Sequence, residues 1–182
     1  MVLKIIKSCI AATSLILFST QAFALINISV GVPLSHTFTG KYNGGDEVKS
    51  DGVSGTFVQI GVPILPGIGM DSYNTKLKVD GATEQHEVET SIYNLYYLLP
   101  IPVINITLGA GVGSTEIKFS GSEKYFDKGP ASQVYASLGF PIIPLFDLHL
   151  SYRSVSSKVK IKSGGEHDMG GNVMGLGIGF NF

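Results

Sequence analysis

Hydrophobic residues alternate with small or polar residues over most of the chain, in segments of about ten residues. The last segment shows the pattern most clearly, because Met174, Leu176, Ile178, Phe180 and Phe182 alternate with three glycines and an asparagine. A period of two is the signal of a β-strand with one apolar face. Eight segments show it, at 25–38, 52–62, 68–79, 88–99, 103–119, 131–140, 146–161 and 171–182. The chain is therefore predicted to be all-β.

The second face of these segments is unusual for a soluble protein, because it consists mainly of Gly, Ser and Asn and carries little charge. Small side chains suit the narrow interior of a barrel, and the large apolar face then points outward into lipid. A membrane-spanning sheet must also close on itself, because lipid offers no partner to an open edge. These features predict an eight-stranded antiparallel transmembrane β-barrel. A secreted β-sandwich with a glycine-rich core is the soluble alternative.

The connections between the segments are of two kinds that alternate along the chain. Three are short and apolar and contain proline, at 63–67, 100–102 and 141–145, and four are polar and charged. Proline is tolerated where a strand ends, because its missing N–H then costs least. Bacterial barrels have short periplasmic turns and longer external loops. The proline-rich turns are therefore predicted to face the periplasm, and the four polar loops to face the outside.

Two segments do not fit the simple pattern. Pro33 lies inside the first segment, where a ladder hydrogen bond must be lost, so a β-bulge or an early strand start is expected there. The third segment has no clean phase, because Ser72 and Asn74 point at lipid if Asp71 points inward. Either a bulge shifts its register, or its second half stands above the membrane.

Residues 1–24 have the layout of a secretory signal peptide. Lys4 and Lys7 precede an apolar stretch, and Ala22-Phe23-Ala24 matches an A-x-A cleavage site. The apolar stretch is well short of the roughly 20 residues that a membrane-spanning helix needs. Cleavage leaves a barrel domain of residues 25–182 without cysteine. Because two of the 13 basic residues go with the signal, 11 remain against 14 acidic residues, and a nucleic-acid partner is not indicated.

The C-terminal segment resembles the end of Gram-negative outer-membrane β-barrels. Those proteins commonly end in phenylalanine with apolar residues at alternate positions before it, which the barrel-assembly machinery recognises as an insertion signal. Leu176, Ile178, Phe180 and Phe182 match this pattern. In size, the chain is similar to the eight-stranded group that includes OmpX, Ail and the membrane domain of OmpA. The resemblance implies a porin-like protein of the outer membrane, expected as a monomer, with lipid, lipopolysaccharide and the assembly machinery as partners.

An eight-stranded barrel has an interior just wide enough for side chains to fill it, so a plugged lumen is expected. Charged groups in such an interior must be paired. The sequence predicts a polar network in the lumen formed by Asp71, Glu89, Asp147, His149 and Arg153. A narrow pore for protons or ions is the alternative interpretation of these charges.

A membrane-lipid hydrolase that uses Ser151 and His149 is a second alternative. The lipid A deacylases, which are small outer-membrane barrels, carry a His-x-Ser-Asn pattern on one strand. The stretch from His149 to Tyr152 matches the His-x-Ser part and departs at the fourth position. A serine nucleophile needs a base within hydrogen-bond reach, but the alternation points both side chains into the lumen and away from lipid. A structural role for His149 is preferred, and no catalysis is expected.

Lys158, Lys160 and Lys162 lie on one face of the seventh segment near its external end. They are predicted to meet the phosphates of lipopolysaccharide, whereas the plainer interpretation is a solvated strand end. The histidines are scattered without ligand spacing, so neither a metal nor a cofactor is predicted. The sequence as a whole predicts an outer-membrane barrel with a structural or surface-interaction role, whose external loops are the candidate site for a surface ligand.

Overall fold

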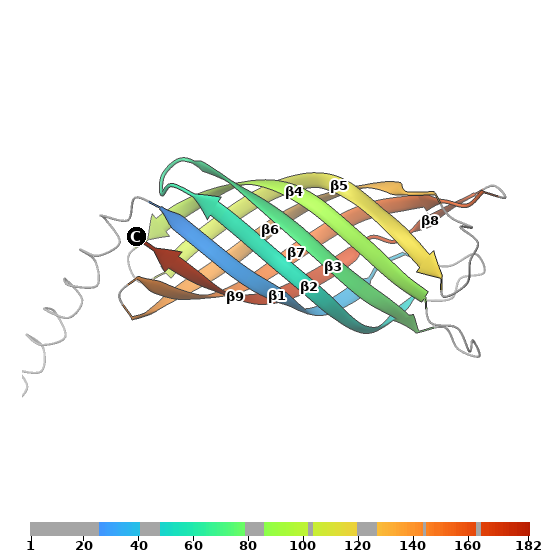
Figure 1. The fold of residues 1–182 in the computed structure, drawn as a ribbon, viewed down its shortest axis with the longest axis horizontal. Coiled ribbons are helices and arrows are strands. Elements are labelled where there is room, and N and C mark those ends of the chain that lie inside the picture. The colour runs from blue at the N-terminus through green and yellow to red at the C-terminus, as the bar shows by residue number, and fades with distance from the viewer. Residues whose placement is uncertain are drawn as a thin grey trace, which may run out of the picture.

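The computed structural model describes residues 26–40, 48–78, 86–101, 104–119, 127–143, 145–162 and 165–182. These residues form nine β-strands (Figure 1). The strands are β1 (Asn27–Phe38), β2 (Lys49–Gly61), β3 (Pro66–Lys78), β4 (His86–Ile101), β5 (Ile104–Phe119), β6 (Gly129–Ile143), β7 (Phe146–Lys160), β8 (Glu166–Asp168) and β9 (Gly171–Asn181). None of the described residues belongs to a helix that is long and apolar enough to cross a membrane.

Eight of these strands close into an antiparallel barrel. Each strand from β1 to β7 pairs with the next one along the chain, β7 pairs with β9, and β9 pairs with β1. The short β8 pairs with the far end of β7 and leads into β9. The closed sheet confirms the predicted eight-stranded barrel and excludes the alternative of an open two-sheet sandwich.

The two ends of the barrel differ in the connections that they carry. The turns β2–β3, β4–β5 and β6–β7 lie at the end that also holds the C-terminus, on the left in Figure 1. We call this the turn end and the opposite end the loop end. The observed strands match the predicted segments to within a few residues. The predicted signal peptide and most of the polar loop residues lie outside the described part of the chain.

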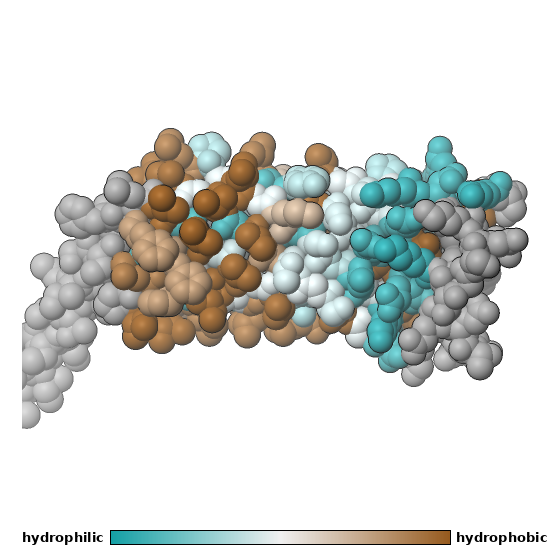
Figure 2. Space-filling view, viewed as in Figure 1, coloured by the Kyte–Doolittle hydropathy of each residue, from teal (hydrophilic) through white to brown (hydrophobic). Residues whose placement is uncertain are grey.

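The outer surface of the barrel has three zones along its axis. From the turn end, the outward side chains of β4 are Leu99, Tyr97, Leu95, Tyr93, Ser91, Glu89 and Glu87. Figure 2 shows the same order on the visible face, from brown at the turn end through white to teal at the loop end. An outer wall that exposes so many large apolar side chains is stable in lipid and not in water. The apolar zone is therefore the membrane-spanning part of the wall.

The strands are longer than this apolar zone. β4 and β5 have 16 residues each. At about 3.3 Å per residue and a tilt of about 40°, such a strand rises about 40 Å, against an apolar band of about 25 Å in outer-membrane barrels. The loop end therefore stands outside the membrane.

This geometry resolves the phase of the third segment. β3 pairs with β4 from Pro66 to Leu77 without a register shift. Asp71 is buried in the lumen, and Ser72 and Asn74 point outward. Ser72 and Asn74 lie above the apolar zone. The sequence left open a bulge or a strand whose second half stands above the membrane, and the second expectation is confirmed.

The interior changes polarity in the opposite sense to the exterior. At the loop end it holds an apolar cluster of Phe38, Leu77, Val88, Ile117, Val159 and Met169. The next cluster toward the turn end consists of Phe57, Tyr73, Ile92, Ala131, Val155 and Val173. Below these clusters the lumen holds polar side chains and a third cluster of Tyr96, Leu98 and Tyr135. The part of the barrel that stands in water thus has the apolar core and polar surface of a soluble protein.

β1 and β2 are joined by a ladder over only part of their length. The ladder joins Asn27–Gly31 to Phe57–Gly61, and the described residues beyond it, 32–38 and 49–56, form no ladder with one another. The register of β1 against β9 also shifts between Pro33 and Ser35. This shift confirms the bulge that the proline predicts.

Proline explains why the ladder ends at this point. Ile26 exchanges both of its backbone hydrogen bonds with Phe182, next to β9. Successive residues of a strand direct their N–H and C=O groups to opposite sides, so Ile26 and the even-numbered residues face β9, and Pro33 faces β2. Gly55 is the next partner in register, but proline has no N–H to donate to it. The ladder therefore stops where its next bond would form.

Hydrogen exchange should reveal the missing part of this ladder. The same alternation directs the N–H groups of Val53 and Gly55 toward β1, where the ladder is absent, and those of Ser54 and Thr56 toward β3. We expect the first two amides to exchange much faster than the second two, which serve as the internal control. NMR of the protein in detergent micelles resolves each amide. Equal protection of all four would contradict the gap.

Candidate functional site

A buried ion pair joins opposite walls of the lumen. Nε of Arg153 on β7 donates to Oδ2 of Asp71 on β3 at 2.9 Å, and the two side chains are 3% and 0% exposed. The guanidinium carbon of Arg153 also lies 3.6 Å from the centre of the Phe57 ring. Burial removes water from both charges, and the opposite charge, the hydrogen bonds and the ring face replace it.

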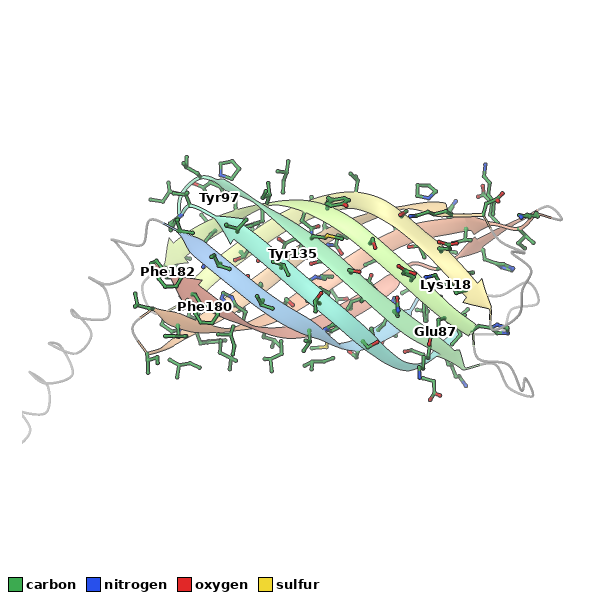
Figure 3. All side chains as sticks on the ribbon, viewed as in Figure 1. Glu87, Tyr97, Lys118, Tyr135, Phe180 and Phe182 are labelled. Carbon is green, nitrogen blue, oxygen red and sulfur yellow. The ribbon has the colours of Figure 1, made fainter. Side chains whose placement is uncertain are left out.

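Amide side chains extend this ion pair into a network. Nε2 of Gln133 donates to Oδ2 of Asp71 and to Oδ1 of Asn94, the latter at 2.7 Å. Nearer the turn end, Nε2 of Gln59 donates to the hydroxyl of Tyr135 at 2.7 Å, and Tyr135 is labelled among the strands in Figure 3. Side chains from five strands therefore meet in the middle of the lumen.

A second buried carboxylate, that of Asp147, lies near the turn end and is hydrogen-bonded by amide side chains. Asp147 is 1% exposed, and its Oδ2 accepts hydrogen bonds from Nδ2 of Asn105 and from Nδ2 of Asn181, the latter at 2.7 Å. Asn27 donates to Oδ1 of Asn181 at 2.8 Å. Amide groups from β5 and β9 thus replace the water that the carboxylate loses on burial, and Asn27 of β1 hydrogen-bonds to the second of these amides.

His149 lies inside the barrel and packs between two glycines. A Cβ added at Gly139 would come within 2.7 Å of the imidazole ring, and one added at Gly179 within 2.2 Å. Glycine at these inward positions makes the room that the ring occupies. A small hollow lies beside the ring, lined among others by Ser29, Gln59, Ser137 and Ser151. The structure therefore places His149 as a packed side chain of the interior.

The Ser151 hydroxyl is engaged by groups other than His149. It donates to the C=O of Gly175 at 3.2 Å and accepts a hydrogen bond from the guanidinium of Arg153. Ser151 is 8% exposed and points into the lumen. A guanidinium cannot accept the proton of a serine nucleophile. The geometry therefore gives the hydrolase alternative neither a general base at Ser151 nor access to lipid.

The prediction that Glu89 belongs to the lumen network is wrong. Val88 and Thr90 are the inward residues at this level of β4, so Glu89 points outward and forms an ion pair with Lys118 on β5. The carboxylate of Glu89 raises the pKa of Lys118, which lies at the loop end beyond the apolar zone (Figure 3). Glu89 and Lys118 belong to the charged outer surface of the loop end.

The structure places Lys158, Lys160 and Lys162 on the exposed surface of the loop end. The register of β7 against β8 sets Lys158 opposite Asp168 and Lys160 opposite Glu166. Neighbours of opposite charge across a strand pair attract each other. Lys158 and Lys160 therefore lie on a ridge of mixed charge, and the acids lower the positive potential that these lysines alone would produce.

The amides of the network are not among the residues that the sequence analysis predicts for it. The amides that hydrogen-bond to the two buried carboxylates are Gln133, Asn105 and Asn181. Each has the inward phase of its strand, as Asp147 has on β7. Strand phase alone, without regard to charge, would have predicted that these three amides point into the lumen.

Among the described residues, no group of three or more His, Cys, Asp or Glu side chains is arranged to hold a metal ion. The sequence matches no protein-family model. No curated protein is similar to it in sequence.

Comparison of the folds places the chain beside known outer-membrane barrels. Neisserial surface protein A aligns with a TM-score of 0.62 at 12% identity, over 86% of this chain and 97% of that one. The outer-membrane protein OprG of Pseudomonas aeruginosa aligns with a TM-score of 0.59 at 12% identity, over 87% and 96%. The Ail protein of Yersinia pestis, in complex with the heparin analogue sucrose octasulfate, aligns with a TM-score of 0.56 at 18% identity, over 86% and 97%. The chain has the fold of a small eight-stranded outer-membrane barrel.

Breaking the buried ion pair should destabilise the barrel strongly. Asp71→Asn and Arg153→Met each leave one buried charge without its partner, and each should lower the free energy of unfolding by about 3–5 kcal/mol. The double variant should lose less than the sum of the two. Urea titration in lipid vesicles, followed by the gel mobility of the folded barrel, measures these values.

Glu89→Gln is the matched control for these variants, because it removes a charge from an exposed ion pair. It should change the free energy of unfolding by less than about 1 kcal/mol. Strictly additive losses in the double variant of Asp71 and Arg153 would show that the two side chains do not interact.

Proposed function

We propose that the protein is a sealed barrel of the outer membrane, with a structural role or a role in surface contacts made by its loop end. In this proposal the barrel neither conducts ions nor catalyses a reaction. The observation that supports it most directly is the filling of the interior by side chains from the turn end to the loop end. The apolar outer zone supports the placement in a membrane, and the fold supports the choice of the outer membrane.

The layers of the lumen argue for a plug and against a narrow pore. Asp147 and its amides occupy the turn end, and the network around Asp71 and Arg153 occupies the middle. The two apolar clusters lie above them. An ion that crosses an apolar layer loses its hydration and gains no polar partner. The plugged lumen is therefore the favoured interpretation.

The loop end supports a surface role because it carries charged side chains beyond the membrane. The outward charged residues at this end include Lys76, Glu87, Glu89, Lys118, Lys128, Lys158 and Lys160. Two proteins of similar fold are named as a Neisserial surface protein and as an attachment invasion locus protein of Yersinia pestis. We extend the surface role to this chain as part of the proposal, together with a contact of Lys158, Lys160 and Lys162 with lipopolysaccharide phosphates.

Membrane insertion is proposed to depend on the outward face of β9 and on the barrel-assembly machinery as a partner. Leu176, Ile178 and Phe182 are exposed on this face, and Phe180 is half-buried with its ring centre 4.9 Å from that of Phe146. Figure 3 shows Phe180 and Phe182 at the turn end. The four residues thus form one apolar strand face that is accessible before the barrel closes.

Phe182→Ala should lower the amount of folded barrel in the outer membrane several-fold, because it removes the terminal residue of this face. Phe140→Ala is the matched control, since Phe140 is also an exposed phenylalanine of the apolar zone but lies on β6. The readout is the heat-shifted band in outer-membrane fractions. If both variants assemble like the unsubstituted protein, the insertion signal lies elsewhere.

The purified protein should show no stable, regular openings in planar bilayers. The expected result follows from the apolar and polar layers that fill the lumen. A porin reconstituted under the same conditions verifies that the bilayer reports channels. Reproducible single-channel steps from the folded, heat-shiftable protein would overturn the plug and favour the pore.

A further inference from the structure

The turn end carries large apolar side chains that face away from the barrel. The most exposed are Ile64, Leu65, Ile142, Ile143, Leu145 and Phe182, with Ile64 at 65%. No charged residue occurs in the stretches 60–70, 97–106 and 138–146, which contain the three turns. An apolar rim of this kind is an aggregation liability in water. It therefore needs surroundings that are not water.

Backbone strain at two rim residues indicates that the apolar side chains have a use there. In the β2–β3 turn, the N–H of Leu65 donates to the C=O of Val62 at 3.1 Å, and Ile64 at the third position has a φ of 72°. Leu145 in the β6–β7 turn has a φ of 75°. Such positions normally take Gly or Asn, and a β-branched residue is an outlier. In water, an apolar residue at such a position would add the cost of an exposed apolar side chain to the cost of the strained backbone.

The turns are also rich in proline. Six of the eight prolines of the chain lie in or beside the turns, at positions 63, 66, 100, 102, 141 and 144. Proline has no N–H, and unpaired backbone groups are what lipid tolerates least. The N–H of Leu65 is bonded within its turn, and the C=O of Leu145 accepts from the N–H of Asn181 at 2.9 Å. This backbone suits surroundings without water.

We propose that the turn end is immersed in the membrane, with its turns among the acyl chains of the adjacent leaflet. The inference rests on the membrane placement in the proposed function and adds the depth at which the barrel sits. The ligand of this surface is lipid: the acyl chains cover the side chains of Ile64, Ile142 and Leu145. Barrel turns that instead stand in the periplasm would meet water.

The distribution of the apolar side chains favours lipid over a protein partner. Ile64 follows β2, Ile101 ends β4 and Ile142 lies near the end of β6, so the apolar residues surround the mouth of the barrel. On the visible face, brown residues extend from the turn end into the apolar zone of the wall (Figure 2). A protein interface normally has a polar rim and occupies one side. A planar leaflet contacts all sides equally.

Single tryptophans can report the surroundings of the rim, because the chain contains none. Ile64→Trp and Ile142→Trp place the probe at the turn end, and the second avoids the position with positive φ in case the first does not fold. Leu95→Trp in the apolar zone and Lys160→Trp at the loop end are the controls. Each purified, heat-shiftable variant is reconstituted into phosphatidylcholine vesicles. Tryptophan fluorescence is then quenched in two separate experiments. The first uses phosphatidylcholine with brominated acyl chains, and the second uses iodide dissolved in the water on both sides of the vesicle membrane.

Both turn-end probes should be quenched by brominated acyl chains about as strongly as Leu95→Trp, and several-fold less by iodide than Lys160→Trp. Iodide quenching equal to that of Lys160→Trp would overturn the proposal. Protection from both quenchers that depends on the ratio of protein to lipid would assign the rim to a second copy of the chain, and would also overturn it. If Leu95→Trp itself escapes bromine, the membrane placement of the proposed function fails, which is distinct from a failure confined to the turn-end probes.

Discussion

Backbone hydrogen bonding in lipid is the constraint on which the rest of the structure depends. An unpaired N–H or C=O in the hydrocarbon costs several kcal/mol, so the sheet must close, and β9 pairs with β1 along its whole length. Closure with eight strands leaves a narrow interior. Inward rings therefore need glycine beside them: Gly175 makes room for the Phe57 ring, and Gly179 makes room for the His149 ring. The β1–β2 ladder stops beyond Gly31, where the outward residues of β2 change from Val58 to Thr56 and Ser54, while Val32 and Leu34 are still exposed on β1.

The same boundary organises the side chains on both sides of the wall. Within the membrane, apolar groups face outward and the interior holds many polar groups linked by hydrogen bonds, with Asp71 and Arg153 as the charged pair. Above the membrane, the charged residues face outward and an apolar cluster that includes Val88 and Ile117 fills the interior. The inversion turns the outer part of the barrel into a water-stable platform, and it closes the lumen with an apolar layer.

Alternation in the sequence predicts the strands, their order and the phase of most side chains, because a period of two follows directly from strand geometry. The error at Glu89 has a physical cause: above the membrane boundary the inward positions of β4 are no longer mainly polar, because Val88 and Ile92 point into the lumen and the charged residue points outward. The contact of Asp71 with Arg153 cannot be read from alternation, since the levels of residues on opposite walls depend on strand tilt and register. The strain at Ile64 is likewise visible only in the backbone angles.

The position of the membrane boundary on β4 distinguishes two cases. In one, the polarity of the barrel inverts where the wall leaves the membrane, and in the other, the wall contacts lipid along its whole height. Spin labels at single cysteines that replace the outward residues of β4 can measure it, through their collision rates with oxygen in lipid and with a nickel complex in water. The outward series is Leu99, Tyr97, Leu95, Tyr93, Ser91, Glu89 and Glu87. Labels from position 99 to position 93 should report lipid, and those at 89 and 87 should report water. Lipid contact that continues to position 87 would contradict the inversion of polarity along the barrel.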